Sequence, residues 1–180
     1  MRIWDDATRY GGVSRALHWS MAALMFWQFG GMLSKVALGR EAGLTKILAG
    51  NHAQVGTILF LLIALRIVWA FLNHGNRPAH GGGLLARVAR VGHAVLYGLM
   101  LLVPTAALLR AWGGEKPFAP FGFPVFGARE ADQVVGVATR IGNDFHGELG
   151  WLMAALVVGH VVMAVAHHFV LRDGTMRRMA

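Results

Sequence analysis

The sequence predicts an all-α integral membrane protein, a four-helix bundle built as a single domain over residues 1–180. Of its 180 residues, 56% are hydrophobic and 14% are charged, whereas soluble domains are about 45–50% apolar and about 25% charged. Four stretches lack Asp, Glu, Lys and Arg, and each is long enough to cross about 30 Å of hydrocarbon as a helix. Lipid tolerates no irregular exposed backbone, so we expect one compact bundle with short connections.

The predicted spans are residues 16–34, 47–72, 91–109 and 149–171. The first is not a convincing cleaved signal peptide, because its apolar region is long and the acidic Asp5 and Asp6 precede it. We expect a turn in the Gly-rich stretch 73–83. The connection before the fourth span is rich in Pro and Phe and ends in a helical pattern at 128–141, which we interpret as an interfacial cap on the outer face.

Charge predicts the orientation. An even number of spans places both termini on one side of the membrane, together with the connection between the second and third spans. That side carries more Lys and Arg per residue than the other two connections, so the positive-inside rule places both termini in the cytoplasm. Arginines that face anionic lipid headgroups account for most of the net charge of +8, and no nucleic-acid partner is expected.

The chain has no cysteine and nine histidines. The lack of cysteine excludes disulfides, iron–sulfur clusters, thiolate zinc sites, cysteine nucleophiles and covalent attachment of a c-type haem. Histidine and methionine remain as soft ligands. An ionisable side chain inside a membrane is costly and is usually there for function, so the intramembrane histidines are the candidate site.

Four histidines are predicted to form two facing pairs at different depths. His146 and His160 are 14 residues apart, which is about 21 Å of helical rise on nearly the same face. His52 begins the second span at the outer level of His146, and His18 lies near the inner end of the first span, level with His160. The expected pairs are therefore His52/His146 and His18/His160.

Haem is the metal group that two histidines per layer fit best. A bare zinc or copper ion normally needs three or four close ligands, whereas a six-coordinate haem iron needs two axial imidazoles. One turn after each candidate stands a small residue, against which a flat macrocycle can lie: Ala22, Gly56, Gly150 and Ala164. The alternative for any single histidine is a hydrogen bond to a neighbouring helix.

The remaining histidines fail the small-residue test or lie outside the spans. His93 is followed at that spacing by Tyr97; it could replace an inner ligand, contact a haem propionate or line a quinone pocket. His167 and His168 are expected at the interface, and His74 and His80 in the loop.

Arg66 follows His52 by 14 residues and is therefore expected on the same face, at the depth of His160. We expect it to pair with a haem propionate. The alternative is an arginine that snorkels to the cytoplasmic headgroups.

Five segments resemble the bacterial cytochrome b561 family, and together they cover nearly the whole chain. They are RYGGVSRALHW at 9–19, NHAQVG at 51–56, GHAVLYGLMLLVP at 92–104, FHGELG at 145–150 and GHVVMAVAHHFVLRDGTMRRM at 159–179. The order of the segments and the histidine spacing together carry the resemblance.

The resemblance implies a cytochrome of the bacterial inner membrane with two non-covalent b haems. His18 and His160 would be the axial ligands of the cytoplasmic-side haem, and His52 and His146 those of the periplasmic-side haem. Small family members include superoxide oxidase, which passes electrons from superoxide to ubiquinone. Others resemble the cytochrome b subunits of hydrogenases and formate dehydrogenases, which pass electrons from a partner subunit to quinone.

Two redox functions and one other remain open. In the first, superoxide meets the outer haem, and ubiquinone or another membrane quinone is reduced, with no catalytic residue beyond haem. Lys116, Arg110 and Arg129 could attract the anion, or they could be ordinary interfacial cations. In the second, the haems relay electrons between a periplasmic dehydrogenase, hydrogenase or soluble cytochrome and the quinone pool. The third is a transporter of protons or metal ions that would bind no haem.

Overall fold

Four long apolar helices dominate the computed structural model, which describes residues 2–78 and 82–179. The first membrane helix is α1 (Gly12–Leu38); the second is α3 (His52–Leu72), preceded by the short α2 (Gly43–Ala49); the third is α4 (Gly83–Gly113); and the fourth is α5 (Gly136–Ala166), which ends in the π-helical turn η3 (His167–Leu171). Three 3-10 turns complete the set: η1 (Pro120–Gly122), η2 (Ala131–Gln133) and η4 (Met176–Arg178). The predicted all-α membrane bundle is confirmed.

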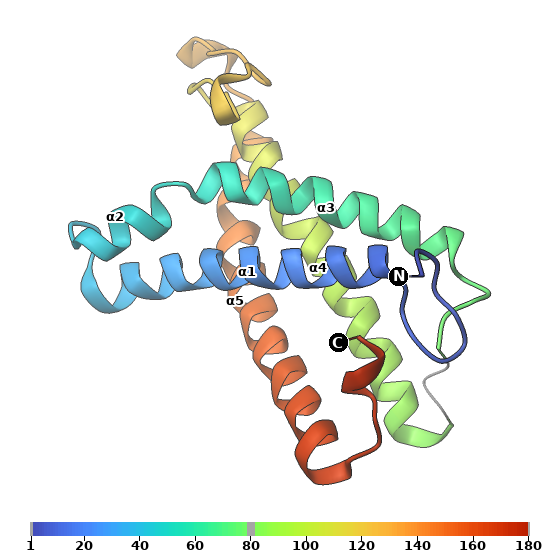
Figure 1. The fold of residues 1–180 in the computed structure, drawn as a ribbon. Helices are drawn as coiled ribbons and strands as arrows, with labels where there is room; N and C mark the ends of the chain where they lie inside the picture. Colours follow the sequence, from blue (N-terminus) through green and yellow to red (C-terminus); the bar gives the residue numbers. More distant parts are fainter. Residues whose placement is uncertain (1, 79–81, 180) are drawn as a thin grey trace.

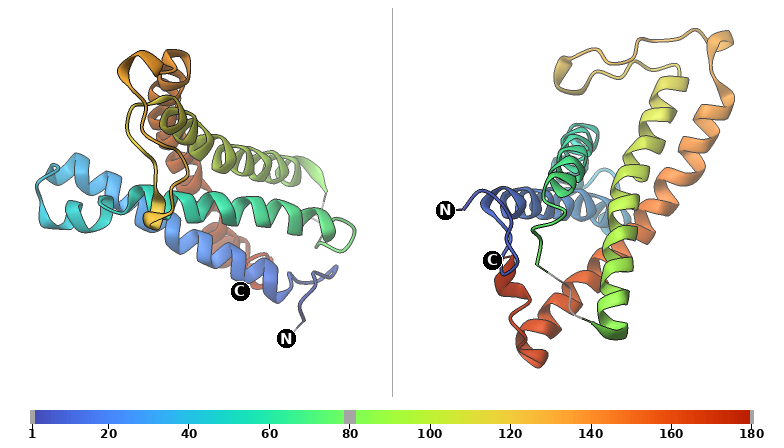
Figure 2. Two further views of the ribbon diagram at one scale, coloured as in Figure 1. Left: turned by 90° about the horizontal axis from the view of Figure 1, so that it is seen from above. Right: turned by 90° about the vertical axis from the view of Figure 1, so that its right-hand side faces the viewer.

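The helices form two pairs that cross one another (Figure 1). In one pair α1 runs beside α3, and in the other α4 and α5 share the most extensive contact of the molecule; α3 joins the pairs by packing on α4. Figure 2 shows that the connection between α4 and α5 extends sideways from the ends of these two helices, and its turn η1 contacts α3. We call the end with this connection the outer end, and the end with both termini the inner end.

Large apolar side chains are exposed around the helices because lipid, not water, surrounds them. Phe26 on α1 is 84% exposed and Phe71 on α3 is 83% exposed. A soluble protein of this size could not present so much apolar surface without associating. These side chains are therefore expected to contact the acyl chains of the bilayer.

Three of the four membrane helices, α1, α4 and α5, begin before the charge-free stretches that predicted them. The largest difference is at α5, which begins at Gly136 and not at residue 149. The helical pattern predicted at 128–141 is confirmed only for residues 136–141, which begin α5, whereas residues 128–135 hold only the 3-10 turn η2. Arg140, Asp144 and Glu148 precede the charge-free stretch but lie within the helix, because a helix that emerges into the headgroup region can carry charges.

The second span is a broken helix. It was predicted to run unbroken over 47–72, but α2 ends at Ala49 and α3 begins at His52. The N–H of Gly50 still donates to the carbonyl of Lys46 at 3.1 Å, and Asn51 then takes a non-helical conformation before α3. Because of the break, His52 is the first residue of a new helix.

The N-terminal segment is fastened to the inner end by a buried carboxylate. Asp5 is 4% exposed; it accepts the N–H of Gly11 at 2.8 Å and pairs with Arg77 Nε at 3.2 Å, while its own N–H donates to Asn73 at 3.1 Å. The C-terminal tail reaches the same end, where Trp19 Nε1 donates to the carbonyl of Met179 at 3.0 Å. Both termini therefore lie together, as an even number of spans requires.

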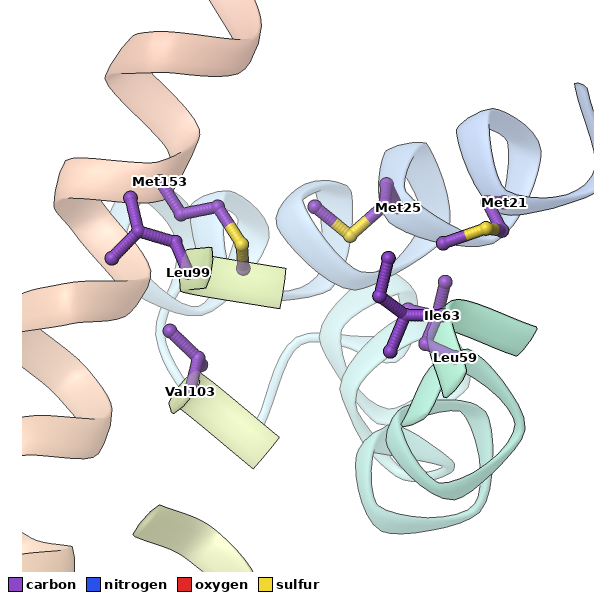
Figure 3. Close-up of a cluster of buried hydrophobic side chains, with 7 residues drawn as sticks. All are labelled: Met21, Met25, Leu59, Ile63, Leu99, Val103 and Met153. Atoms are coloured by element: carbon purple, nitrogen blue, oxygen red, sulfur yellow. The ribbon is translucent and has the colours of Figure 1, made fainter. Parts of the chain in front are cut away.

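A small core of sulfur-containing and aliphatic side chains fills the middle of the bundle (Figure 3). All four membrane helices contribute to it: Met21 and Met25 from α1, Leu59 and Ile63 from α3, Leu99 and Val103 from α4, and Met153 from α5. Met153 is seven residues from both His146 and His160, so the core separates the inner and outer histidines by apolar packing.

Candidate haem site

The outer histidines face one another across the bundle. His52 at the start of α3 and His146 on α5 have ring centres 5.9 Å apart, with the ring planes at 90°. Both side chains are partly buried. The predicted outer pair is thus brought together although one histidine begins its helix and the other lies ten residues inside its own.

A backbone carbonyl orients His146. Its Nδ1 lies 2.9 Å from the carbonyl oxygen of Val103 on α4. A carbonyl only accepts hydrogen bonds, so Nδ1 carries the proton and Nε2 keeps its lone pair. An acceptor on the second ring nitrogen is the usual support of a metal-binding histidine.

The backbone carbonyl of His52 accepts a hydrogen bond, whereas one nitrogen of its ring has no hydrogen-bond partner among the described residues. Gln28 Nε2 on α1 donates to the carbonyl oxygen of His52 at 3.0 Å. The His52 Nδ1 atom is buried and has no hydrogen-bond partner within the described part of the chain. A buried polar atom without a partner costs stability and points to a ligand or a functional state.

The inner layer holds three imidazoles. His18 on α1 and His160 on α5 have ring centres 6.3 Å apart at 74°. His93 on α4 lies closer to His160, at 5.3 Å and 76°. Of the roles open to His93, its position in this layer fits either an inner ligand or a neighbour of the group that the inner pair holds.

Arg66 turns into the inner layer and does not extend toward the headgroups. Its Nε donates to the hydroxyl of Tyr97 at 2.8 Å, and its Nη1 lies 3.1 Å from His18 Nδ1. Arg66 therefore stands at the depth that its spacing from His52 predicts. Its partners are protein groups, and a propionate contact remains a proposal.

Both pairs have the separation that axial ligation requires. An imidazole nitrogen binds a transition metal at about 2.0 Å, and with its ring centre about 1.1 Å further away, two rings on opposite sides of one ion have centres about 6 Å apart. The observed 6.3 and 5.9 Å fit this value. Ring planes at 74° and 90° are compatible as well, because each ring can rotate about the axial bond.

The four small residues one turn after the histidines differ in how much space surrounds them. A Cβ built on Gly150 would meet nothing within 4 Å, whereas one on Gly56 would lie 3.3 Å from Gln28 Nε2. In the inner layer Ala164 is half-buried and Ala22 is exposed. The open face at Gly150 is the one best suited to a flat group.

The donor set favours haem over a bare ion. Across residues 2–78 and 82–179, no group of three or more His, Asp or Glu side chains is arranged to hold a metal ion. A facing pair of imidazoles in each layer, with His93 as a third ring beside the inner pair, matches a group that brings its other four ligands with it. The residues present therefore fit haem.

The interfacial histidines lie away from both pairs. His167 is bonded through Nδ1 to Asp173 at 2.6 Å, and His168 packs edge-on against Phe169 at 4.6 Å. Hydrogen bonds from Thr175 lower the pKa of Asp173 to about 2, so this carboxylate stays ionised near neutral pH. His74 is exposed in the connection after α3, and His80 lies outside the described residues.

Comparison with known proteins decides the family. The family model described as prokaryotic cytochrome b561 matches residues 9–180. The chain belongs to this family. Among its relatives is cytochrome b561 homolog 2 of Escherichia coli (strain K12), which is 30% identical over 180 residues, 99% of this chain and 95% of the relative.

Membership of the cytochrome b561 family implies b-type haem and a role in membrane electron transfer. The four helices make this member a multi-pass membrane protein. Tyr97, Gln28 and the carbonyl of Val103 contact the histidine layers without having been predicted to do so. Of these three, only Tyr97 could have been found from the sequence, since it stands one turn after His93 on the same helix face.

Proposed function

We propose that this cytochrome b561-family protein binds two b haems, one between His18 and His160 and one between His52 and His146. The observation that carries the proposal is the pair of facing imidazoles in each layer, with ring centres 6.3 and 5.9 Å apart. The apolar core between the layers supports two separate sites, because Met153 of this core lies midway along α5 between His146 and His160. Haem supplies reversible one-electron chemistry at its iron.

We further propose that the protein is a superoxide:ubiquinone oxidoreductase. Two superoxide ions each give up one electron and leave as O₂, and one ubiquinone takes up both electrons and two protons to become ubiquinol. The chain's part is to hold the two sites, exclude water between them and attract the anion. Arg110 on α4 lies against Gly142 of α5, one turn before His146. It therefore places positive charge beside the outer pair, where a small anion would be drawn in.

The other predicted cations of the outer end differ in their surroundings. Arg129 donates to the carbonyl of Trp112 at 2.9 Å and lies over its ring, with 5.2 Å between the guanidinium carbon and the ring centre. Lys116 is exposed. Arg129 therefore supports the outer connection, and Arg110 is the better candidate for attracting superoxide.

A second candidate function is electron transfer from a periplasmic protein to quinone. Exposed aromatic side chains on the outer connection favour it: Phe121 is 57% exposed and Phe123 is 73% exposed, on a hairpin closed by the Phe118–Phe126 bridge. Such side chains suit a docking partner such as a dehydrogenase, a hydrogenase or a soluble cytochrome.

Haem counting tests the ligand assignment. Pyridine haemochrome analysis of the purified protein is expected to give two haems per chain. His146→Ala and His160→Ala should each lose one haem, and the matched control His168→Ala should keep both. A protein without haem, or one whose haem content is unchanged in both ligand variants, would contradict the assignment.

Substrate turnover separates the two redox functions. The protein is reconstituted into liposomes with ubiquinone, a superoxide source is added on the outer side, and ubiquinol is measured. We expect ubiquinol formation that superoxide dismutase abolishes and that Arg110→Gln slows, with Arg87→Gln at the inner end as the control. Full haem content without superoxide-dependent ubiquinol would leave the relay function as the better account.

A further inference from the structure

Arg66 fixes the proton position of His18. A guanidinium group has hydrogen-bond donors and no acceptor, so His18 Nδ1, 3.1 Å from Arg66 Nη1, must accept. A neutral imidazole whose Nδ1 accepts carries its proton on Nε2. The contact therefore holds His18 in the tautomer whose Nε2 has no free lone pair.

His146 is held in the opposite tautomer. Its Nδ1 donates to the carbonyl oxygen of Val103 at 2.9 Å, which leaves Nε2 as the free lone pair. A metal ion can bind this nitrogen without any change in the hydrogen bonds of the ring. The outer pair is thus ready for an iron atom on the His146 side.

The contact between Arg66 and His18 excludes ligation by a neutral His18. Nδ1 is occupied by the guanidinium, and Nε2 bears a proton. Ligation through Nε2 requires the proton to move to Nδ1, and an Nδ1–H cannot face a guanidinium donor. Arg66 Nη1 must therefore leave the ring before His18 can bind iron.

Tyr97 allows this movement. It accepts a hydrogen bond from Arg66 Nε at 2.8 Å, and Nε is a different nitrogen from the one that contacts His18. Release of Nη1 thus leaves one anchor of the side chain in place.

We infer that Arg66 is a positioning residue that delays haem binding at the inner pair, so that the outer site fills before the inner one. The inference rests on the proposed ligand pairs. A hydrogen bond to a charged group is worth enough to shift an equilibrium by about tenfold or more, so we expect the outer site to bind haem at least about tenfold more tightly while Arg66 faces His18.

Expression at graded haem supply tests the order of filling. The protein is purified from cells whose haem synthesis is limited in steps, and the haem in each site is quantified from spectra. The reference spectra come from His146→Ala, which keeps the inner site, and His18→Ala, which keeps the outer site. At an average of one haem per chain we expect most of the haem in the outer site; equal filling, or inner filling first, would overturn the inference.

Two substitutions of Arg66 separate the proton position from the charge. Arg66→Lys keeps a positively charged group with donors only, so the preference for the outer site should persist. Arg66→Gln is neutral, and its amide oxygen can accept from an Nδ1–H, so His18 can take the ligating tautomer and the preference should fall. Arg90→Gln, near the inner end of α4, is the matched control and should behave as wild type.

The opposite result has a distinct meaning. If Arg66 instead supports the inner haem through its charge alone, Arg66→Gln will empty the inner site further and widen the preference, which would overturn the inference. The ratio is measured within chains that retain the outer haem, so a loss of folded protein does not obscure it. Failure of the ligand assignment would look different, because His146→Ala and His18→Ala would then not yield two distinct one-haem proteins.

Discussion

Single contacts give the histidines of this bundle different chemical states. The backbone of Val103 sets the proton of His146, and the guanidinium of Arg66 sets that of His18. His52 has neither kind of partner on Nδ1. Three of the four proposed ligands therefore start from three different hydrogen-bonding situations, and their affinities for a metal group should differ accordingly.

Gly150 offers a residue-scale test of the outer haem site. A Cβ there would meet nothing within 4 Å, one turn after His146. We expect Gly150→Leu to fill this space and displace the outer haem, so that haem content falls from about two to about one per chain by pyridine haemochrome. Gly150→Ala is the matched control and should keep both haems, since alanine occupies the equivalent positions 22 and 164. Two haems in the leucine variant would mean that the macrocycle does not lie against this face.

The sequence predicted which rings face one another, but not what orients them. A spacing of 14 residues is about 40° short of four full helical turns. It therefore places His146 and His160 on one face of α5, and it places Arg66 on the face of His52 at the inner level. The carbonyl that orients His146 belongs to every residue alike and leaves no mark in the sequence. Arg66 was expected to face a propionate or the headgroups, and its contact with His18 depends on how α1 and α3 pack.

At the scale of elements, the sequence feature that locates a membrane span differs from the features that determine where its helix begins and ends. Charge-free stretches mark where a chain lies in hydrocarbon, and they located all four membrane helices. Helix ends depend on local caps and on packing, so α5 starts well before its apolar stretch and the second span breaks before His52. Within α4, Pro104 has no N–H to donate to the carbonyl of Met100, yet the helix continues to Gly113. The next residue, Thr105, donates its Oγ1 to the carbonyl of Leu101 at 2.7 Å.

The close contact between α4 and α5 depends on glycine. A Cβ built on Gly142 would meet Arg110 and would lie 2.6 Å from the carbonyl oxygen of Ala106. Because the obstacle is backbone, Gly142→Ala must push the helices apart, at a cost of about 1–3 kcal/mol. We expect a fall of several degrees in the unfolding temperature, followed by circular dichroism at 222 nm in detergent. The control Gly98→Ala adds its methyl group in open space and should leave the temperature unchanged or higher; equal temperatures for both variants would show that the helices do not approach so closely.

At the scale of the molecule, the two ends of the bundle are built differently. The inner end is closed by the buried Asp5 network and by the contact of Trp19 with the tail. The outer end instead exposes Phe123 on a long connection, and Arg110 lies against Gly142, one turn before His146. The apolar core lies between them, so each proposed haem would have a distinct chemical neighbourhood. The orientation of the molecule in the membrane then decides which of the two sites a periplasmic electron donor can reach.

Orientation in the membrane can be measured cleanly because the natural chain has no cysteine. Asn76 lies in the connection at the inner end and Gly127 in the connection at the outer end, and both are exposed. Cytoplasmic termini, as the distribution of cations predicts, mean that an impermeant maleimide added to spheroplasts should label Gly127→Cys, and should label Asn76→Cys only after permeabilisation.

The reverse labelling pattern would show the opposite orientation in the membrane, with the His18 and His160 pair at the periplasmic surface. Arg110 would then face the cytoplasm together with the outer pair, and periplasmic superoxide would meet the inner end, where Asp5 and its partners cover the bundle. Wild-type protein, which should remain unlabelled in both conditions, provides the baseline. The labelling side therefore tests whether the positive charge near the outer pair is where an anionic substrate from the periplasm could reach it.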